Sequence, residues 1–150
     1  MGIFVHILSS RIRMDIKRIE LTDAEKFAKQ EFDKYYIKNG IQVSNKVSFM
    51  ACMNDINIGV IIANIFESEA YINSLIVSEE YRGLGIGAEL LQKVEEHCRN
   101  NGVKLIALHT YRFEAPDFYK KHGYIQEGLT KHISDRRLDR FYFVKYLDSR

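Results

Sequence analysis

Three glycines stand at alternate positions in residues 81–91, YRGLGIGAELL, directly before an apolar stretch with helical spacing. Glycine costs roughly 1 kcal/mol relative to alanine inside a helix, so a helix start this rich in glycine needs a compensating role. The N-terminus of a helix presents unpaired N–H groups and a partial positive charge. Glycines let the chain turn several of these N–H groups toward one anion. Residues 82–87 therefore predict a cradle for a phosphate or diphosphate.

Several kinds of loop contain such glycines. A Walker A loop requires Gly-Lys-Ser/Thr at its end, and this segment has no such lysine. The Rossmann pattern GxGxxG/A is met by Gly83, Gly85 and Ala88. However, SEEYR separates the pattern from the preceding strand, and the next strand, KLIALHT, has no carboxylate for a ribose. A tight connection without a ligand is a further alternative, although two glycines would suffice for a turn.

A third pattern, Arg/Gln-x-x-Gly-x-Gly/Ala, is met by Arg82, Gly85 and Gly87. With this loop and with APDFYKKHGY at residues 115–124, the chain resembles the GNAT superfamily of N-acetyltransferases. The resemblance is strong over residues 72–124, and the element order agrees over residues 14–147. It implies acetyl-CoA as co-substrate. Its diphosphate would be held by the loop residues Arg82, Gly83, Leu84, Gly85, Ile86 and Gly87.

The resemblance also implies a cleft for the pantetheine arm of the cofactor. The strand SLIV would splay away from the strand ALHT, and the arm would lie between them as an additional strand. The cofactor-binding residues on this strand would be Leu75, Ile76 and Val77, of which the main chain of Leu75 and Val77 would bond the arm. Their side chains have the character of sheet core.

Tyr119 is the catalytic residue that the resemblance implies, because it is the tyrosine of the Phe-Tyr pair in residues 115–124. A phenol with an ordinary pKa near 10 is protonated at neutral pH and can protonate the leaving thiolate. A tyrosine that only packs its helix against the sheet is the alternative. A base is harder to identify.

Several family members use a glutamate as base near the position of Tyr71, but no carboxylate occurs from Tyr71 to Val77. Glu67 and Glu69 lie upstream, and His109 on the neighbouring strand could accept the proton through water. Arg112 stands where many members have asparagine, and it could instead meet a CoA phosphate or an acidic substrate.

The elements that must position these residues follow one another in a simple order. We expect a strand at 14–20, a helix at 21–40, a hairpin of strands at 45–53 and 56–67, a strand at 70–77, a helix at 87–101, a strand at 104–110, a helix at 115–123 and a strand at 140–147. The order predicts an α+β fold with a mixed, mostly antiparallel sheet, a parallel join after the central helix, and, by the resemblance, helices on both faces. On the central helix, Glu95 is expected on the polar face.

Composition limits the class of protein. The chain has 150 residues, 46% hydrophobic and 28% charged, and a net charge of +2, which gives no reason to expect nucleic acid or an anionic membrane as a partner. Cys52 and Cys98 form no CxxC motif, and no metal site is expected. No apolar run approaches the ~20 residues that span a bilayer. Residues 1–13 are expected to be an N-terminal extension, residues 14–150 a single domain, and the protein cytoplasmic.

These observations predict an N-acyltransferase that moves an acetyl group from acetyl-CoA to a primary amine by direct attack in a ternary complex. The acceptor would be a small-molecule or peptide amine, and members of such a family can form homodimers. The alternative is a non-catalytic acyl-CoA-binding sensor or interaction module. The missing carboxylate near Tyr71 and the presence of Arg112 favour that alternative.

Overall fold

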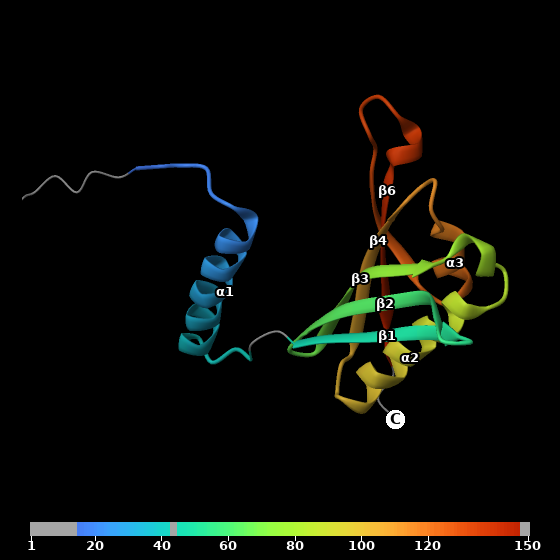
Figure 1. The fold of residues 1–150 in the computed structure, drawn as a ribbon, viewed down its shortest axis with the longest axis horizontal. Coiled ribbons are helices and arrows are strands. Elements are labelled where there is room, and N and C mark those ends of the chain that lie inside the picture. The colour runs from blue at the N-terminus through green and yellow to red at the C-terminus, as the bar shows by residue number, and fades with distance from the viewer. Residues whose placement is uncertain (1–14, 43–44, 148–150) are drawn as a thin grey trace, which may run out of the picture. The chain divides into compact units, whose positions relative to one another are not determined.

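The protein is described by a computed structural model over residues 15–42 and 45–147, and the chain divides into two compact units at residues 39 and 40 (Figure 1). The first unit contains one helix, α1 (Leu21–Lys38), which buries no side chain. Residues 15–20 precede it without regular structure, so the strand expected at 14–20 does not form there; Met14 lies outside the described residues. An extended segment becomes a strand only when a neighbour takes up its backbone hydrogen bonds, and no described strand pairs with this one.

The second unit is built on a six-stranded sheet with the order β1-β2-β3-β4-β6-β5. Its strands are β1 (Asn45–Met53), β2 (Ile56–Phe66), β3 (Glu69–Val77), β4 (Leu105–Tyr111), β5 (Ile125–Thr130) and β6 (Arg140–Tyr146). Every neighbouring pair is antiparallel except β3 and β4, which are parallel. The mixed, mostly antiparallel α+β sheet is therefore confirmed. The edge strand β5 was not expected, because its residues IQEGLT are nearly all exposed and carry no alternating apolar pattern.

Helices α2 (Ile86–Asn100) and α3 (Pro116–Lys121) pack on one face of this sheet. The apolar side of α2, with Leu90, Leu91, Val94 and Cys98, is buried against sheet residues such as Ile61 and Ile106. On strand β2, Gly59 lies directly under α2. A Cβ there would lie 3.2 Å from Leu90 Cδ1 and 3.2 Å from the Ile76 carbonyl oxygen, so glycine is needed for the helix to pack this near.

The sheet opens between β3 and β4. These strands pair only over residues 69–71 and 105–107, after which β3 continues beside β2 and β4 continues beside β6. Figure 1 shows β1–β3 running across the view while β4 and β6 turn upright. A bulge contributes to this divergence, because Ile62 lies opposite Ser74 and Ala63 opposite Ile72, which leaves Asn73 as an extra residue in β3. Bulges bend a strand and increase its twist. The splayed cleft expected from the sequence is therefore present.

Candidate active site

The edge of β3 that faces the opening has free backbone groups. The Ser78 N–H donates to the Ile58 carbonyl of β2 at 2.8 Å. Because alternate residues of a strand direct their backbone groups to opposite sides, Ile76 also faces β2, while Leu75 and Val77 face the opening. These two residues are the ones whose main chain was expected to bind the pantetheine arm. Their side chains pack against the core, whereas the Ile76 side chain is 55% exposed, so the expectation that all three belong to the core is wrong for Ile76.

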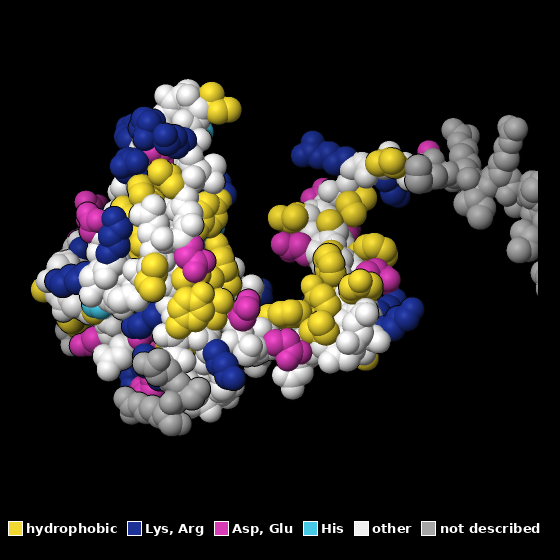
Figure 2. Space-filling view, turned by 180° about the vertical axis from the view of Figure 1, so that it is seen from behind, with side chains coloured by type: hydrophobic (Ala, Val, Ile, Leu, Met, Phe, Trp, Pro, Cys, Tyr) yellow, Lys and Arg dark blue, Asp and Glu magenta, His cyan; other side chains and the backbone are white. Residues whose placement is uncertain are grey.

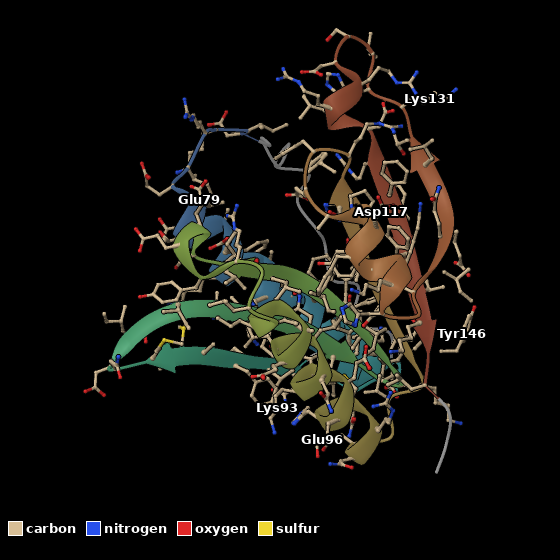
Figure 3. All side chains as sticks on the ribbon, turned by 90° about the vertical axis from the view of Figure 1, so that its right-hand side faces the viewer. Glu79, Lys93, Glu96, Asp117, Lys131 and Tyr146 are labelled. Atoms are coloured by element: carbon tan, nitrogen blue, oxygen red, sulfur yellow. The ribbon has the colours of Figure 1, made fainter. Side chains whose placement is uncertain are left out.

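The glycine-rich loop follows β3 after one short turn. A short turn of 3-10 helix, Glu79–Tyr81, leads into Arg82, and the chain then passes Gly83 at φ 77° and Gly85 at φ 82° before α2 begins (Figure 3). These left-handed conformations explain both glycines, since a Cβ strongly disfavours them. A Cβ built on either residue would have no atom within 4 Å, so the space in front of the loop is open.

The amides of residues 83–88 form the N-terminal end of α2. The first helical hydrogen bond runs from the Glu89 N–H to the Gly85 carbonyl at 3.1 Å, and no side chain caps the helix. No described residue accepts a hydrogen bond from the N–H groups of residues 83–88. Six successive unpaired N–H groups at a helix N-terminus suit a polyanion. These N–H groups suit the diphosphate cradle that the sequence predicts at residues 82–87.

Arg82 connects this cradle to the edge of β3. Its Nε donates to the Val77 carbonyl at 3.0 Å. That carbonyl faces the opening and has no partner in β2, so the side chain satisfies it while holding the start of the loop against the strand. The two backbone surfaces expected to bind one cofactor are thereby fixed relative to each other.

Helix α3 lies beside the first turn of α2. A Cβ on Gly87 would lie 3.6 Å from the Phe118 ring, an ordinary van der Waals distance, so the two helices lie one side chain apart at this point. Next to Phe118, Tyr119 is 8% exposed and packs against Tyr124 and Phe143, with ring centroids 5.7 and 6.0 Å away. Its hydroxyl has no hydrogen-bond partner among the described residues. Burial, with a smaller contribution from Glu114, raises the pKa of Tyr119 to about 12, which keeps the phenol protonated.

The end of α3 fixes the position of Tyr119. The Tyr124 N–H donates to the Tyr119 carbonyl at 3.0 Å, and the N–H of Gly123, at φ 83°, donates to the Lys120 carbonyl at 3.1 Å. This pair of bonds is a Schellman motif, which needs a left-handed residue after the helix. The Gly-aromatic pair noted in the sequence thus ends the helix that carries Tyr119.

A second group of polar side chains lies on the opposite face of the sheet, where β3 and β4 begin to diverge. Tyr71 Oη and His109 Nδ1 are hydrogen-bonded across the two strands. Tyr142 lies opposite His109 in the β4–β6 ladder, with the ring centroids 6.2 Å apart. Burial raises the pKa of Tyr71, and neighbouring Tyr142 adds to the effect, while Arg140 and a backbone hydrogen bond of His109 act in the opposite direction. The sequence indicated His109 as a proton acceptor but gave no reason to pair it with Tyr71.

Arg112 has several partners within the protein. Its Nη2 donates to Asp139 Oδ2 at 2.9 Å, its Nε donates to the Arg136 carbonyl at 3.1 Å, and its guanidinium lies over the Phe141 ring. Asp139 is fully buried and also accepts from Arg136 Nε and the His132 N–H, each at 2.9 Å. Burial alone would raise the pKa of Asp139, but these hydrogen bonds outweigh it and lower the pKa to about 2. Arg112 is therefore part of an ion-pair cluster that closes the β5–β6 hairpin.

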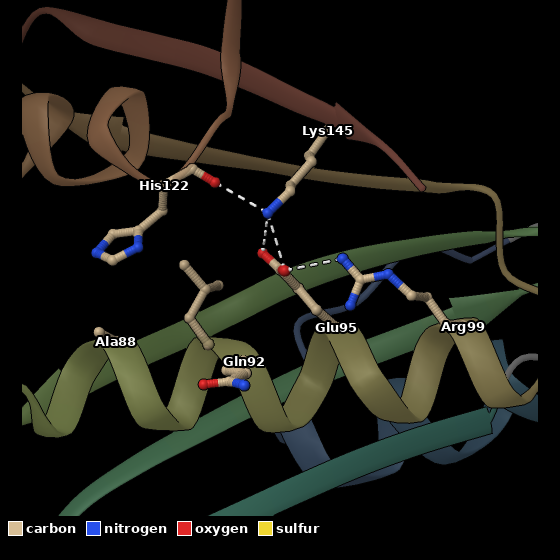
Figure 4. Close-up of a pocket in the computed structure, with 7 residues that line it drawn as sticks. Ala88, Gln92, Glu95, Arg99, His122 and Lys145 are labelled. Atoms are coloured by element: carbon tan, nitrogen blue, oxygen red, sulfur yellow. Dashed lines mark hydrogen bonds and ion pairs between the residues drawn. The ribbon is translucent and has the colours of Figure 1, made fainter. Parts of the chain in front are cut away.

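Glu95 is a further charged residue whose environment the sequence did not indicate. It was expected on the polar face of α2, but it is 6% exposed and accepts two hydrogen bonds from Lys145 Nζ, each at 2.8 Å (Figure 4). Arg99 and the Tyr124 hydroxyl also bond to Glu95, and Lys145 donates to the His122 carbonyl at 2.9 Å. The buried carboxylate is therefore fully compensated, as a buried charge must be.

Some kinds of site are not formed by the described residues. Their His, Cys, Asp and Glu side chains make no group of three or more that could hold a metal ion. None of their helices is long and apolar enough to cross a membrane. Of the two residues considered as bases, Glu69 is the first residue of β3 and Glu67 lies in the turn before it. Glu67 accepts a hydrogen bond from the Gln42 N–H at 2.6 Å.

Comparison with known proteins gives consistent results. Protein YxbD of Bacillus subtilis is 35% identical over 96 residues, covering 62% of this chain and 60% of YxbD, so the chain spans less than two thirds of that relative. N-alpha-acetyltransferase 50 of Danio rerio is 31% identical over 117 residues, covering 73% and 68% of the two chains. The crystal structure of an acetyltransferase from Bacillus cereus is 26% identical with a TM-score of 0.73, covering 89% of this chain and 98% of that one.

The family profile gives the decisive result. The profile of the acetyltransferase (GNAT) family matches residues 13–124, which include the glycine-rich loop, the diverging strands and α3. This match covers well over half of the 150 residues, and it spans both motifs from which the resemblance was inferred. The chain belongs to the acetyltransferase (GNAT) family, whose acetyl donor is acetyl-CoA.

Proposed function

We propose that the protein transfers the acetyl group of acetyl-CoA to a primary amine, by direct attack of the amine on the thioester. The observation that carries the proposal is the row of N–H groups at residues 83–88, which have no acceptor among the described residues. A diphosphate satisfies such a row. The free edge of β3 continues from it, so the pantetheine arm would lie along Leu75 and Val77, and the acetyl group would reach the point where β3 and β4 diverge.

Two groups supply the proton transfers in this proposal. His109 Nδ1, if protonated, donates to Tyr71 Oη, which leaves the lone pair of Nε2 to accept the proton of the amine, directly or through water. Tyr71 is then a positioning residue that selects this tautomer. A backbone N–H on the free edge of β3, close to the point where β3 and β4 diverge, can stabilise the oxyanion of the tetrahedral intermediate. Tyr119, protonated because its pKa is raised, donates to the thiolate of CoA as it leaves.

The proposal is tested by incubating the full chain with acetyl-CoA and a panel of small amines, amino acids, polyamines, aminoglycosides and peptides, while recording the released thiol. We expect acetylation of at least one class of amine. His109→Gln should lower kcat by roughly 100-fold, the usual scale of general-base catalysis. His97→Gln is the matched control, because His97 lies on α2 beside Phe49, away from the opening.

The same experiment separates enzyme from sensor. A sensor binds CoA, seen as a raised Tm, but releases no thiol with any amine. That outcome would contradict the proposed function while leaving the cradle intact. The structure weakens both reasons for that alternative, because Arg112 has a partner in Asp139 and a Tyr71–His109 pair stands where a carboxylate was sought.

A further inference from the structure

Arg140 is a cation without a carboxylate partner on the sheet face that carries Tyr71 and His109. It lies opposite Tyr111 in the β4–β6 ladder, one step from the His109–Tyr142 pair. Its guanidinium carbon is 5.5 Å from the Tyr111 ring centroid, and its Nη1 donates a long hydrogen bond, 3.4 Å, to Tyr142 Oη. No described carboxylate lies within ion-pair distance of it, although the other partly buried cations, Lys145 and Arg99, share Glu95.

Asp139, the acidic residue nearest to Arg140 in the sequence, already has other partners. Asp139 is fully buried and receives its hydrogen bonds from Arg112, Arg136 and the His132 N–H. At the tip of the hairpin, Arg137 has its own partner in Asp135, at 2.7 Å. Figure 2 shows Lys and Arg side chains gathered at one end of the second unit.

The hydrogen-bonding capacity of Arg140 is also unfilled. The Nε atom is buried and has no hydrogen-bond partner in the structure. A guanidinium has five N–H donors, and a partly buried charge of this kind is costly unless it is paired. Its planar arrangement of donors matches the two oxygens of a carboxylate.

From this position we infer that Arg140 binds a carboxylate of the acceptor, so that the acceptor is a small amino-carboxylate, such as an amino acid, rather than a polyamine or aminoglycoside. The inference rests on the proposed function. In an antiparallel ladder, diagonal neighbours such as His109 and Arg140 have Cβ atoms about 7–8 Å apart. An amine at His109 and a carboxylate at Arg140 are then separated by a few bonds. The same cation repels an acceptor that carries several positive charges.

The test compares matched acceptors that differ only in the carboxylate: an amino acid, its amide, and the amine left by its decarboxylation. We expect the wild type to favour the amino acid by roughly 10- to 100-fold in kcat/KM, the scale of a charge-assisted hydrogen-bonded pair. Arg140→Gln should abolish the preference for the amino acid over the two analogues that lack the carboxylate, and Arg140→Lys should retain part of it. Arg137→Gln, which removes an arginine that has its own carboxylate, is the control and should retain the full preference.

A binding measurement keeps this inference separate from the proposed function. Titration of the amino acid into the CoA-saturated protein should give heat that Arg140→Gln abolishes. Amines acetylated without regard to the carboxylate, or a preference that survives in Arg140→Gln, would overturn the inference and leave the proposed function standing. Arg140-dependent binding without acetylation of any amine would overturn the proposed function alone. Neither binding nor acetylation would overturn both.

Discussion

The cradle can be tested with two glycines that share a conformation but not a location. Gly85 begins α2 at φ 82°, and Gly102 follows the end of the same helix at φ 75°; a Cβ on either would meet no atom within 4 Å. Alanine at either position must adopt a left-handed conformation, which costs about 1–2 kcal/mol. For a chain of this length, this strain lowers Tm by about 2–8 °C. Gly85→Ala and Gly102→Ala should therefore lose similar stability.

Their effects on the cofactor should differ. The Cβ of Gly85→Ala enters the open space in front of the amides of residues 83–88, where the diphosphate is proposed to bind. Loss of one charge-assisted hydrogen bond amounts to about 1.5–3 kcal/mol, or roughly a 10- to 100-fold increase in the Kd of acetyl-CoA by calorimetry. Gly102→Ala should bind acetyl-CoA like the wild type. Equal Kd values for both variants and the wild type would refute the assignment of this loop to the diphosphate.

Three further predictions concern single side chains. Tyr119→Phe should lower kcat by roughly 100-fold in steady-state assays while the KM of acetyl-CoA barely changes. Because the pKa of Tyr119 is about 12, its deprotonation should cause no loss of wild-type activity up to pH 10. A kcat of the variant equal to that of the wild type would show that Tyr119 is not the acid. Asp139→Asn should lower Tm at pH 7. Since the pKa of Asp139 is lowered to about 2, the difference in Tm between the variant and the wild type should vanish as the pH falls from about 4 to 2. A Tm difference that persists in acid would contradict the ion-pair account. Lys145→Met should lower the free energy of unfolding in urea by about 3 kcal/mol, because Glu95 stays buried with Arg99 as its remaining ion-pair partner. Adding Glu95→Leu should restore most of this stability. If Lys145 contributed only packing, the second substitution would restore nothing.

The parts of the fold that could be predicted from the sequence are those with a strong local signal. The glycines of residues 82–87, the apolar face of α2 and the Gly123 end of α3 each follow from short-range geometry, and the structure contains all three. The strands β1–β4 and β6 were expected because their apolar residues favour extended structure. Strand β5 lacks such a pattern, and its place depends on pairing with β6.

The parts of the site that could not be predicted depend on contacts between distant segments. Tyr71 and His109 are joined across two strands 38 positions apart, and Lys145 reaches Glu95 over 50 positions. Arg112 was noticed because it departs from the family pattern, but its partner is on a hairpin that no local signal placed beside it. Helical periodicity assigned Glu95 to the surface, but its hydrogen bonds with Lys145 and Tyr124, which come from distant segments, hold it in a buried position.

Lys145 connects three elements, α2, α3 and β6. Each of them carries a group to which the proposals above give a different role. Lys145 binds Glu95 on α2, the helix with the cradle; it binds the His122 carbonyl, at the end of the helix that carries Tyr119; and it belongs to β6, the strand of Arg140. A shift of any one of these elements would strain the same two contacts. Under the proposed function, Lys145 would keep the sites of donor, leaving group and acceptor aligned without touching any of the three. We therefore expect substitutions at Lys145 to disturb turnover through misalignment even where each binding surface is intact.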